Sequence, residues 1–127
     1  MSENFWIGGT WQAGNGELMQ SVNPATEMVI WQGNSATSDD VDAAIKAARV
    51  AFKSWGYCAF DDRLKVIRAF ADLLVERKPE LAQAIMRETG KALWDAEGEV
   101  GAMAGKLDIS LKAYEERTGS RESSNGA

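Results

Sequence analysis

Histidine is absent from this chain of 127 residues, and cysteine occurs once, as Cys58. Without histidine, the chain offers neither an imidazole base nor a histidine ligand for a metal ion. A single cysteine excludes an intramolecular disulfide and is typical of a reducing compartment. Apolar runs long enough to span a membrane are lacking, as are the basic and apolar regions of a signal peptide. We therefore expect a cytoplasmic protein.

Positive charge is also scarce, with 14 Lys and Arg residues against 19 Asp and Glu residues, which gives a formal net charge of -5. The basic residues are scattered along the chain and form no tract. Because an acidic surface is repelled by phosphate groups, neither nucleic acid nor an anionic membrane is expected as a partner. The hydrophobic fraction of 45% is ordinary for a globular domain.

Short alternating runs in residues 1–36 predict a β-hairpin region. The stretch FWIGGTWQAG indicates a hairpin, with strands 5–7 and 10–12 joined by two glycines that accept positive φ angles. Two further strands are predicted at 17–22 and 28–32. Asn-Pro-Ala-Thr at 23–26 is the turn between them, because proline fixes φ and asparagine bonds locally.

From residue 37 to residue 118 the apolar spacing becomes helical and predicts four helices. Thr37 and Asp40 have the spacing of a capping box for the first helix, and Asp61 is predicted to cap the second. The fourth helix, from about 91 to 117, contains Gly98 and Gly101. Each glycine costs about 1 kcal/mol against alanine, so we expect both to pack closely against another element. The polar residues 119–127 are typical of a tail or linker.

Candidates for chemistry are few. Cys58 has no histidine to activate it, so we interpret it as a small, half-buried residue rather than a nucleophile. The acidic sets at 39–42 and 61–62 lie at helix starts, where carboxylates complement the helix dipole, and capping is a better interpretation than metal binding. The stretch GGTWQAGNG lacks the strand, glycine loop and helix of a phosphate site.

The pair Gly90-Lys91 stands between two helical runs. A phosphate-binding loop of the Walker type would need a second glycine five residues earlier and a serine or threonine after the lysine. Ile85 and Ala92 occupy those positions. We therefore interpret Gly90 as a left-handed glycine that ends one helix before the next begins. No complete active site is present in these residues.

The order of these segments resembles the amino-terminal region of the NAD(P)-dependent aldehyde dehydrogenase superfamily. The matching elements are the I-x-G-x-W hairpin, the V-N-P-A-T turn, the helix V-x-x-A-x-x-A-A-R-x-A-F-x-x-W, and E-T-G-K followed by Glu99. Together they cover residues 5 to about 126. The segments VIWQGNSAT and GKLDISLKAYEERTGSRES resemble the branch that oxidises N-succinylglutamate semialdehyde in arginine breakdown.

The resemblance implies an NAD-dependent enzyme in which a cysteine thiolate attacks the aldehyde, hydride passes to NAD, and the thioester is hydrolysed. The family's catalytic and cofactor-binding residues lie downstream of the segments matched here, so no catalytic or cofactor-binding residue is assigned and the segment alone is expected to be inactive. Some relatives hold a monovalent cation near the turn and the long helix. The matching positions are Val22, through its carbonyl, and Glu99.

Two hypotheses follow. In the first, the chain is an α+β fragment, mainly α: short hairpins, then about four helices, the start of an aldehyde dehydrogenase fold. Its partner is then the remainder of that fold, in a homo-oligomeric enzyme, and apolar faces such as Leu93, Val100 and Leu107 are expected to lack cover. In the second, the chain is a free-standing helical module that binds a protein through its apolar stripes.

Overall fold

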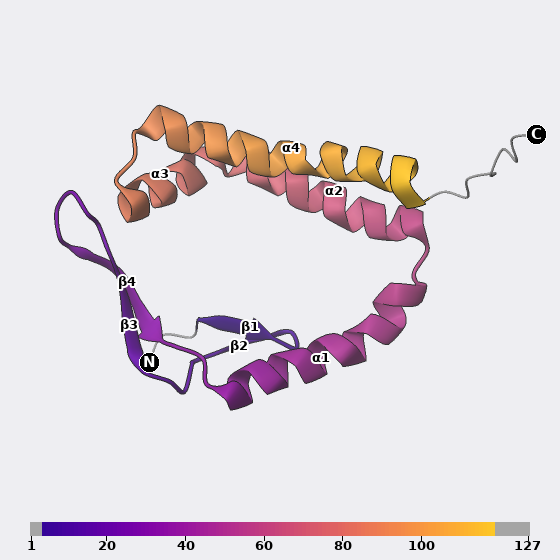
Figure 1. The fold of residues 1–127 in the computed structure, drawn as a ribbon, viewed down its shortest axis with the longest axis horizontal. Helices are drawn as coiled ribbons and strands as arrows, with labels where there is room; N and C mark the ends of the chain where they lie inside the picture. Colours follow the sequence, from indigo (N-terminus) through magenta and orange to yellow (C-terminus); the bar gives the residue numbers. More distant parts are fainter. Residues whose placement is uncertain (1–3, 119–127) are drawn as a thin grey trace, which may run out of the picture.

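The computed structural model describes residues 4–118, in which two antiparallel strand pairs precede four helices. Figure 1 shows the arrangement: α2, α3 and α4 lie together, and α1 and the two hairpins lie apart from them. The strands are β1 (Phe5–Ile7), β2 (Thr10–Gln12), β3 (Leu18–Val22) and β4 (Val29–Asn34). The helices are α1 (Ser38–Tyr57), α2 (Phe60–Glu76), α3 (Lys78–Thr89) and α4 (Leu93–Thr118). The predicted fold class is confirmed.

The first hairpin has the predicted strands and turn. Gly8 and Gly9 take φ angles of 60° and 87°, which residues with a Cβ rarely adopt. Across the hairpin, Trp6 pairs with Trp11, and the two rings meet edge to face with centroids 5.3 Å apart. Both rings remain more than half exposed. The hairpin is therefore held by its turn, by its backbone ladder and by a cross-strand aromatic pair.

The second hairpin has the predicted order with shifted ends. β3 begins one residue later than expected, and β4 extends beyond residue 32 because Gly33 and Asn34 pair with Met19 and Leu18. Gly and Asn are poor strand formers, so the residue pattern did not indicate this extension. In the turn, the Asn23 side chain accepts a hydrogen bond from the backbone of Ala25 at 2.9 Å, as the asparagine predicted.

Helix α1 begins with the predicted capping box. The Thr37 backbone N–H donates to the Asp40 carboxylate at 2.8 Å, and the Asp40 N–H donates to the Thr37 hydroxyl at 3.4 Å. The side chain of Asn15 also donates to Asp40, at 2.6 Å, and so connects the loop after β2 to this helix. These hydrogen bonds, first the one from the Thr37 backbone, lower the pKa of Asp40 to about 2.

The predicted cap of α2 is wrong. The N-cap lies two residues before Asp61, at Ala59, which makes no side-chain hydrogen bond, and the helix begins at Phe60. The carbonyl of Ala59 accepts from the backbones of Asp62 and Arg63, so Asp61 already lies within the first turn. There its carboxylate still complements the helix dipole. Pro79 lies in the first turn of α3, where its missing N–H costs no hydrogen bond.

The core is small and lies where α2 and α3 pack on α4. Ala82, Ala96 and Val100 are fully buried, with Leu81, Ile85 and Met86 partly buried against them. The prediction that Val100 lacks cover is therefore wrong, because α3 covers its face of α4. The expectation for Gly98 and Gly101 is also wrong: a Cβ at either position would meet no atom of the described residues within 4 Å. Both glycines lie on the face of α4 away from the core.

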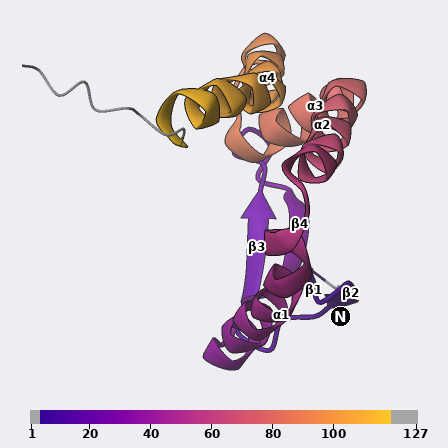
Figure 2. The same ribbon diagram turned by 90° about the vertical axis from the view of Figure 1, so that its right-hand side faces the viewer.

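The three-helix layer of α2, α3 and α4 meets α1 and the hairpins at few points. In Figure 2, turned by 90°, the β3–β4 hairpin extends from α1 towards the three-helix layer. Large apolar side chains are exposed along α1, including Val41, Ile45, Val50 and Phe52. No helix within residues 4–118 has the length and hydropathy needed to cross a membrane.

Candidate functional site

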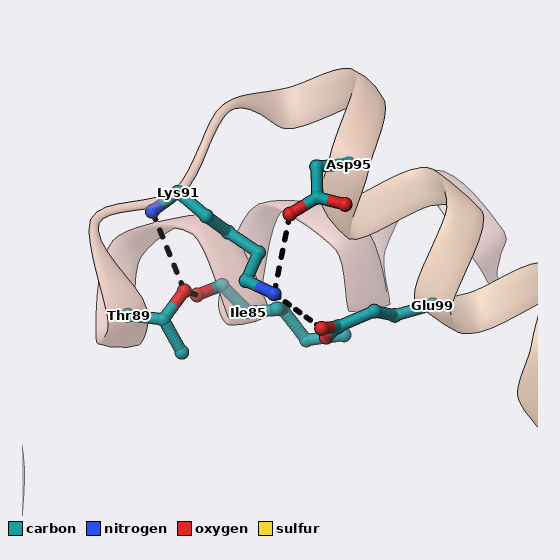
Figure 3. Close-up of polar contacts among 5 residues, drawn as sticks. All are labelled: Ile85, Thr89, Lys91, Asp95 and Glu99. Carbon is teal, nitrogen blue, oxygen red and sulfur yellow. Dashed lines mark hydrogen bonds and ion pairs between the residues drawn. The ribbon is translucent and has the colours of Figure 1, made fainter.

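The joint between α3 and α4 is closed by local hydrogen bonds. Gly90 ends α3 with a φ of 74°, in the left-handed region, and its N–H donates to the carbonyl of Met86 at 2.9 Å. The Thr89 hydroxyl donates to the Ile85 carbonyl at 2.7 Å and accepts the N–H of Lys91 at 3.4 Å. Figure 3 shows this arrangement. The predicted glycine ending is confirmed.

The same joint contacts the turn between β3 and β4. A Cβ placed on Gly90 would lie 2.7 Å from Cγ of Pro24, so the proline ring packs against the backbone of Gly90 too closely for a side chain to fit between them. One residue before Val22, the Ser21 hydroxyl donates to the Glu88 carboxylate at 2.9 Å. The V-N-P-A-T turn and the E-T-G-K joint, which are 60 to 70 residues apart in the chain, therefore form one structural unit.

Lys91 provides the positive charge of this unit. Its ammonium contacts the carboxylates of Asp95, at 3.3 Å, and Glu99 (Figure 3). The Lys91 side chain is 26% exposed, whereas the ion-paired Lys65 and Lys112 are 76% and 77% exposed. The hydrogen bond to Glu99, followed by the contact with Asp95, raises the pKa of Lys91. Lys91 therefore stays charged at neutral pH, and the stability linked to its raised pKa is lost as the pH rises through that pKa.

These groups bind one another and leave no phosphate site. The N–H of Lys91 points to Thr89 and its ammonium to carboxylates, so neither is directed at a common anion. Within residues 4–118, no cluster of three or more acidic, cysteine or histidine side chains could hold a metal ion. The earlier interpretation of Gly90-Lys91 as a helix joint is consistent with this geometry.

The residues predicted for a monovalent cation lie in different surroundings. Val22 pairs with Val29 at an irregularity of the β3–β4 ladder, next to Ser21. Glu99 is bound to the Lys91 ammonium. The carboxylate that the structure joins to strand β3 is instead that of Glu88, which the sequence reasoning did not select. Its partner Ser21 lies 67 residues away, and no local pattern could indicate that contact.

The other candidates are dispersed. Cys58 follows the last turn of α1 as a free, half-buried thiol, and its N–H donates to the carbonyl of Trp55 at 3.3 Å. Asp39 and Asp40 lie in the first turn of α1, and Asp61 and Asp62 lie in the first turn of α2. Their places match helix starts, as the sequence indicated.

A dinucleotide-binding fold needs a strand, a glycine-rich turn and a helix whose N-terminus receives the phosphates. The described strands pair only with their neighbours in antiparallel hairpins. Of the four helices, only α1 follows a strand directly, and its N-terminus is closed by Thr37 and Asp40. The described residues therefore do not form a cradle that fits NAD.

Comparison with known proteins gives a match over most of the chain. The model of the aldehyde dehydrogenase family matches residues 11–127. The chain is 53% identical over 123 residues to N-succinylglutamate 5-semialdehyde dehydrogenase of Paraburkholderia xenovorans (strain LB400), covering 97% of this chain and 25% of that protein. The protein of the same name from Chromobacterium violaceum is 50% identical over the same shares.

Solved structures agree with this match. An NAD-dependent benzaldehyde dehydrogenase from Corynebacterium glutamicum superimposes with a TM-score of 0.82 at 29% identity, over 95% of this chain and 27% of that one. A betaine aldehyde dehydrogenase from Staphylococcus aureus, in complex with NAD+, gives a TM-score of 0.83 at 27% identity, over 98% and 26%. The chain thus spans about a quarter of the length of the curated relatives that it matches.

Proposed function

The chain belongs to the aldehyde dehydrogenase family, and from this premise we propose that it is the amino-terminal portion of an NAD-dependent enzyme that oxidises N-succinylglutamate 5-semialdehyde to N-succinylglutamate. The choice of substrate rests on the identity of 50 to 53% to two dehydrogenases that are named for it. In this proposal the enzyme acts in arginine breakdown, in the cytoplasm, as a homo-oligomer.

The proposed division of labour follows from the chemistry. Aldehyde oxidation needs an activated nucleophile, donors for the developing oxyanion, and a bound nicotinamide that accepts the hydride. We propose that residues beyond 127 supply all three. The described residues then act as support: the contacts of Gly90 with Pro24 and of Glu88 with Ser21 fix the helical layer to the strands.

An activity measurement tests this proposal. The full-length protein and residues 1–127 are purified separately and assayed for NADH formation with N-succinylglutamate 5-semialdehyde. We expect turnover by the full-length protein and none by the segment. N-acetylglutamate 5-semialdehyde, which carries an acetyl group in place of the succinyl group and likewise cannot cyclise through a free amine, is the matched control substrate. Its kcat/KM is expected to be at least about tenfold lower because the binding contacts of the succinyl carboxylate are lost. NAD reduction by the segment, or equal use of both aldehydes, would contradict the proposal.

The predicted cation site at the Val22 carbonyl and Glu99 is a separate proposal. Because the Lys91 ammonium already binds Glu99, we expect a monovalent cation there only when Lys91 is removed. Melting temperatures of the full-length protein are compared in KCl and in choline chloride of equal ionic strength. In Lys91→Met we expect a potassium-specific rise in Tm that the double variant with Glu99→Gln lacks. A rise that survives Glu99→Gln but disappears with Glu88→Gln would instead place the cation beside Ser21.

A further inference from the structure

Arg63 lies in a small apolar hollow without a hydrogen-bond partner for its Nε. The hollow has a volume of about 200 Å³ and is lined by the end of α1, the start of α2 and the last turns of α4. Its other lining residues are Trp55, Phe60, Leu64, Ile67, Leu111 and Tyr114. Among the described residues, Nε of Arg63 is the one buried side-chain nitrogen or oxygen that makes no hydrogen bond.

Two features make this arrangement costly as it stands. A buried N–H without an acceptor destabilises the fold, because it has lost its hydrogen bond to water and gained none in return. Arg63 also lies in the first turn of α2, where the positive end of the helix dipole opposes a positive side chain. Both costs would be removed by one negatively charged acceptor in the hollow.

The described residues do not supply that acceptor. Asp62, the residue before Arg63, is already paired, because its carboxylate binds the Lys65 ammonium at 2.8 Å. The wall opposite is aromatic: Phe60 and Tyr114 stack with their centroids 4.8 Å apart and their planes 12° apart. Trp55, Phe60 and Tyr114 are 41%, 38% and 47% exposed, so water reaches the rim of the hollow until another part of the fold covers it. Once these apolar walls are covered, they strengthen a charge–charge contact made between them. A carboxylate, which a guanidinium binds with two parallel hydrogen bonds, fits this setting best.

We propose that Arg63 is an anchoring residue that binds the carboxylate of an aspartate or glutamate from the part of the dehydrogenase beyond residue 127. This inference rests on the proposed function, because it requires that such a part exists. The chain covers 25% of its relatives, so about three quarters of the fold is available to provide the group. The contact fixes the meeting point of α1, α2 and α4 to the remainder of the molecule.

The experiment uses the full-length protein and three variants. Arg63→Met keeps the length of the side chain and removes its charge, Arg63→Lys keeps the charge, and Arg68→Met removes an exposed charge from the same helix as a matched control. We expect Arg63→Met to lower Tm by about 5 °C, because it leaves a buried carboxylate unpaired. Arg63→Lys should lose clearly less, and Arg68→Met should stay within about 1 °C of the parent protein.

Three results would overturn the proposal. One is a Tm of Arg63→Met equal to that of Arg68→Met, and another is an equal loss in the Met and Lys variants of Arg63, which would mean that charge is irrelevant. The third is a rise in Tm of the parent protein, but not of Arg63→Met, on addition of millimolar succinate, which would show an open small-molecule site. Dehydrogenase activity of the parent protein, measured beside these melts, tests the proposed function separately, so failure of one is distinguished from failure of the other.

Discussion

A Gly90→Val variant of the full-length protein is expected to lose about 4 kcal/mol of unfolding free energy, the largest effect of any single substitution considered for this chain. Two causes add. Gly90 has a φ of 74°, where a β-branched residue is strained. A Cβ at this position would also lie 2.7 Å from Cγ of Pro24. The loss is measured by denaturant unfolding with the slope held to the parent value.

The two causes can be separated with alanine. Gly9 also has a positive φ, 87°, but a Cβ there would meet nothing within 4 Å, so Gly9→Ala reports strain without collision. We expect Gly90→Ala to cost about 1 kcal/mol more than Gly9→Ala. In a double-mutant cycle, adding Pro24→Ala should restore the extra unfolding free energy lost in Gly90→Ala. Adding Pro24→Ala to Gly9→Ala should restore none. Equal costs at the two glycines, or no coupling with Pro24, would contradict the close approach.

Local features of the fold could be predicted because their causes lie within a few residues. The Gly8-Gly9 turn, the Thr37–Asp40 capping box and the Gly90 helix ending each depend on the φ preference or side-chain reach of residues at most three apart. Asp61 shows the limit of this reasoning. An acidic residue before an apolar stripe indicates a cap, but the N-cap lies two residues earlier, at Ala59, whose side chain makes no capping hydrogen bond.

Features that depend on packing were not predicted. The spacing of Val100 placed it on the apolar face of α4 but could not say that α3 covers it. The cost of Gly98 and Gly101 suggested close packing, yet in the described residues these glycines face open space. A helical pattern defines which residues share a face, whereas the partner of that face is set by the whole fold.

In the candidate site, too, local features could be predicted from the sequence and long-range contacts could not. The E-T-G-K joint was found from the sequence because glycine and lysine stand side by side, and its family resemblance is confirmed by the comparisons. The contacts that give the joint its place, Ser21 with Glu88 and Pro24 with Gly90, join residues more than 60 positions apart. Arg63 gave no signal at all, since an arginine in a first helical turn has the pattern of an exposed residue.

Residues 1–127 purified alone are expected to lack a cooperative thermal transition, to bind a hydrophobic dye and to associate as concentration rises. Among the described residues, Ala82, Ala96 and Val100 are the only buried hydrophobic side chains, too small a core to offset the conformational entropy of the chain. Trp6 and Ile45 line the groove between β1 and α1 and are 60% and 54% exposed, and Phe52, further along α1, is 60% exposed. Circular dichroism on heating, dye fluorescence and size-exclusion chromatography measure the three properties.

A pair of substitutions distinguishes a fragment from a self-sufficient module that keeps these apolar side chains free for a partner. Ile45→Ser with Phe52→Ser on α1 should reduce association and dye binding of the isolated segment, because less apolar surface meets water. In the full-length protein the same pair should lower the unfolding free energy by about 3 kcal/mol or more, because the remainder of the fold buries these side chains. A free-standing module predicts a different result: a monomeric segment with one cooperative melt, whose Tm the pair leaves unchanged. If the two substitutions improve the behaviour of the isolated segment but destabilise the full-length protein, this surface of α1 is one that the rest of the same fold covers.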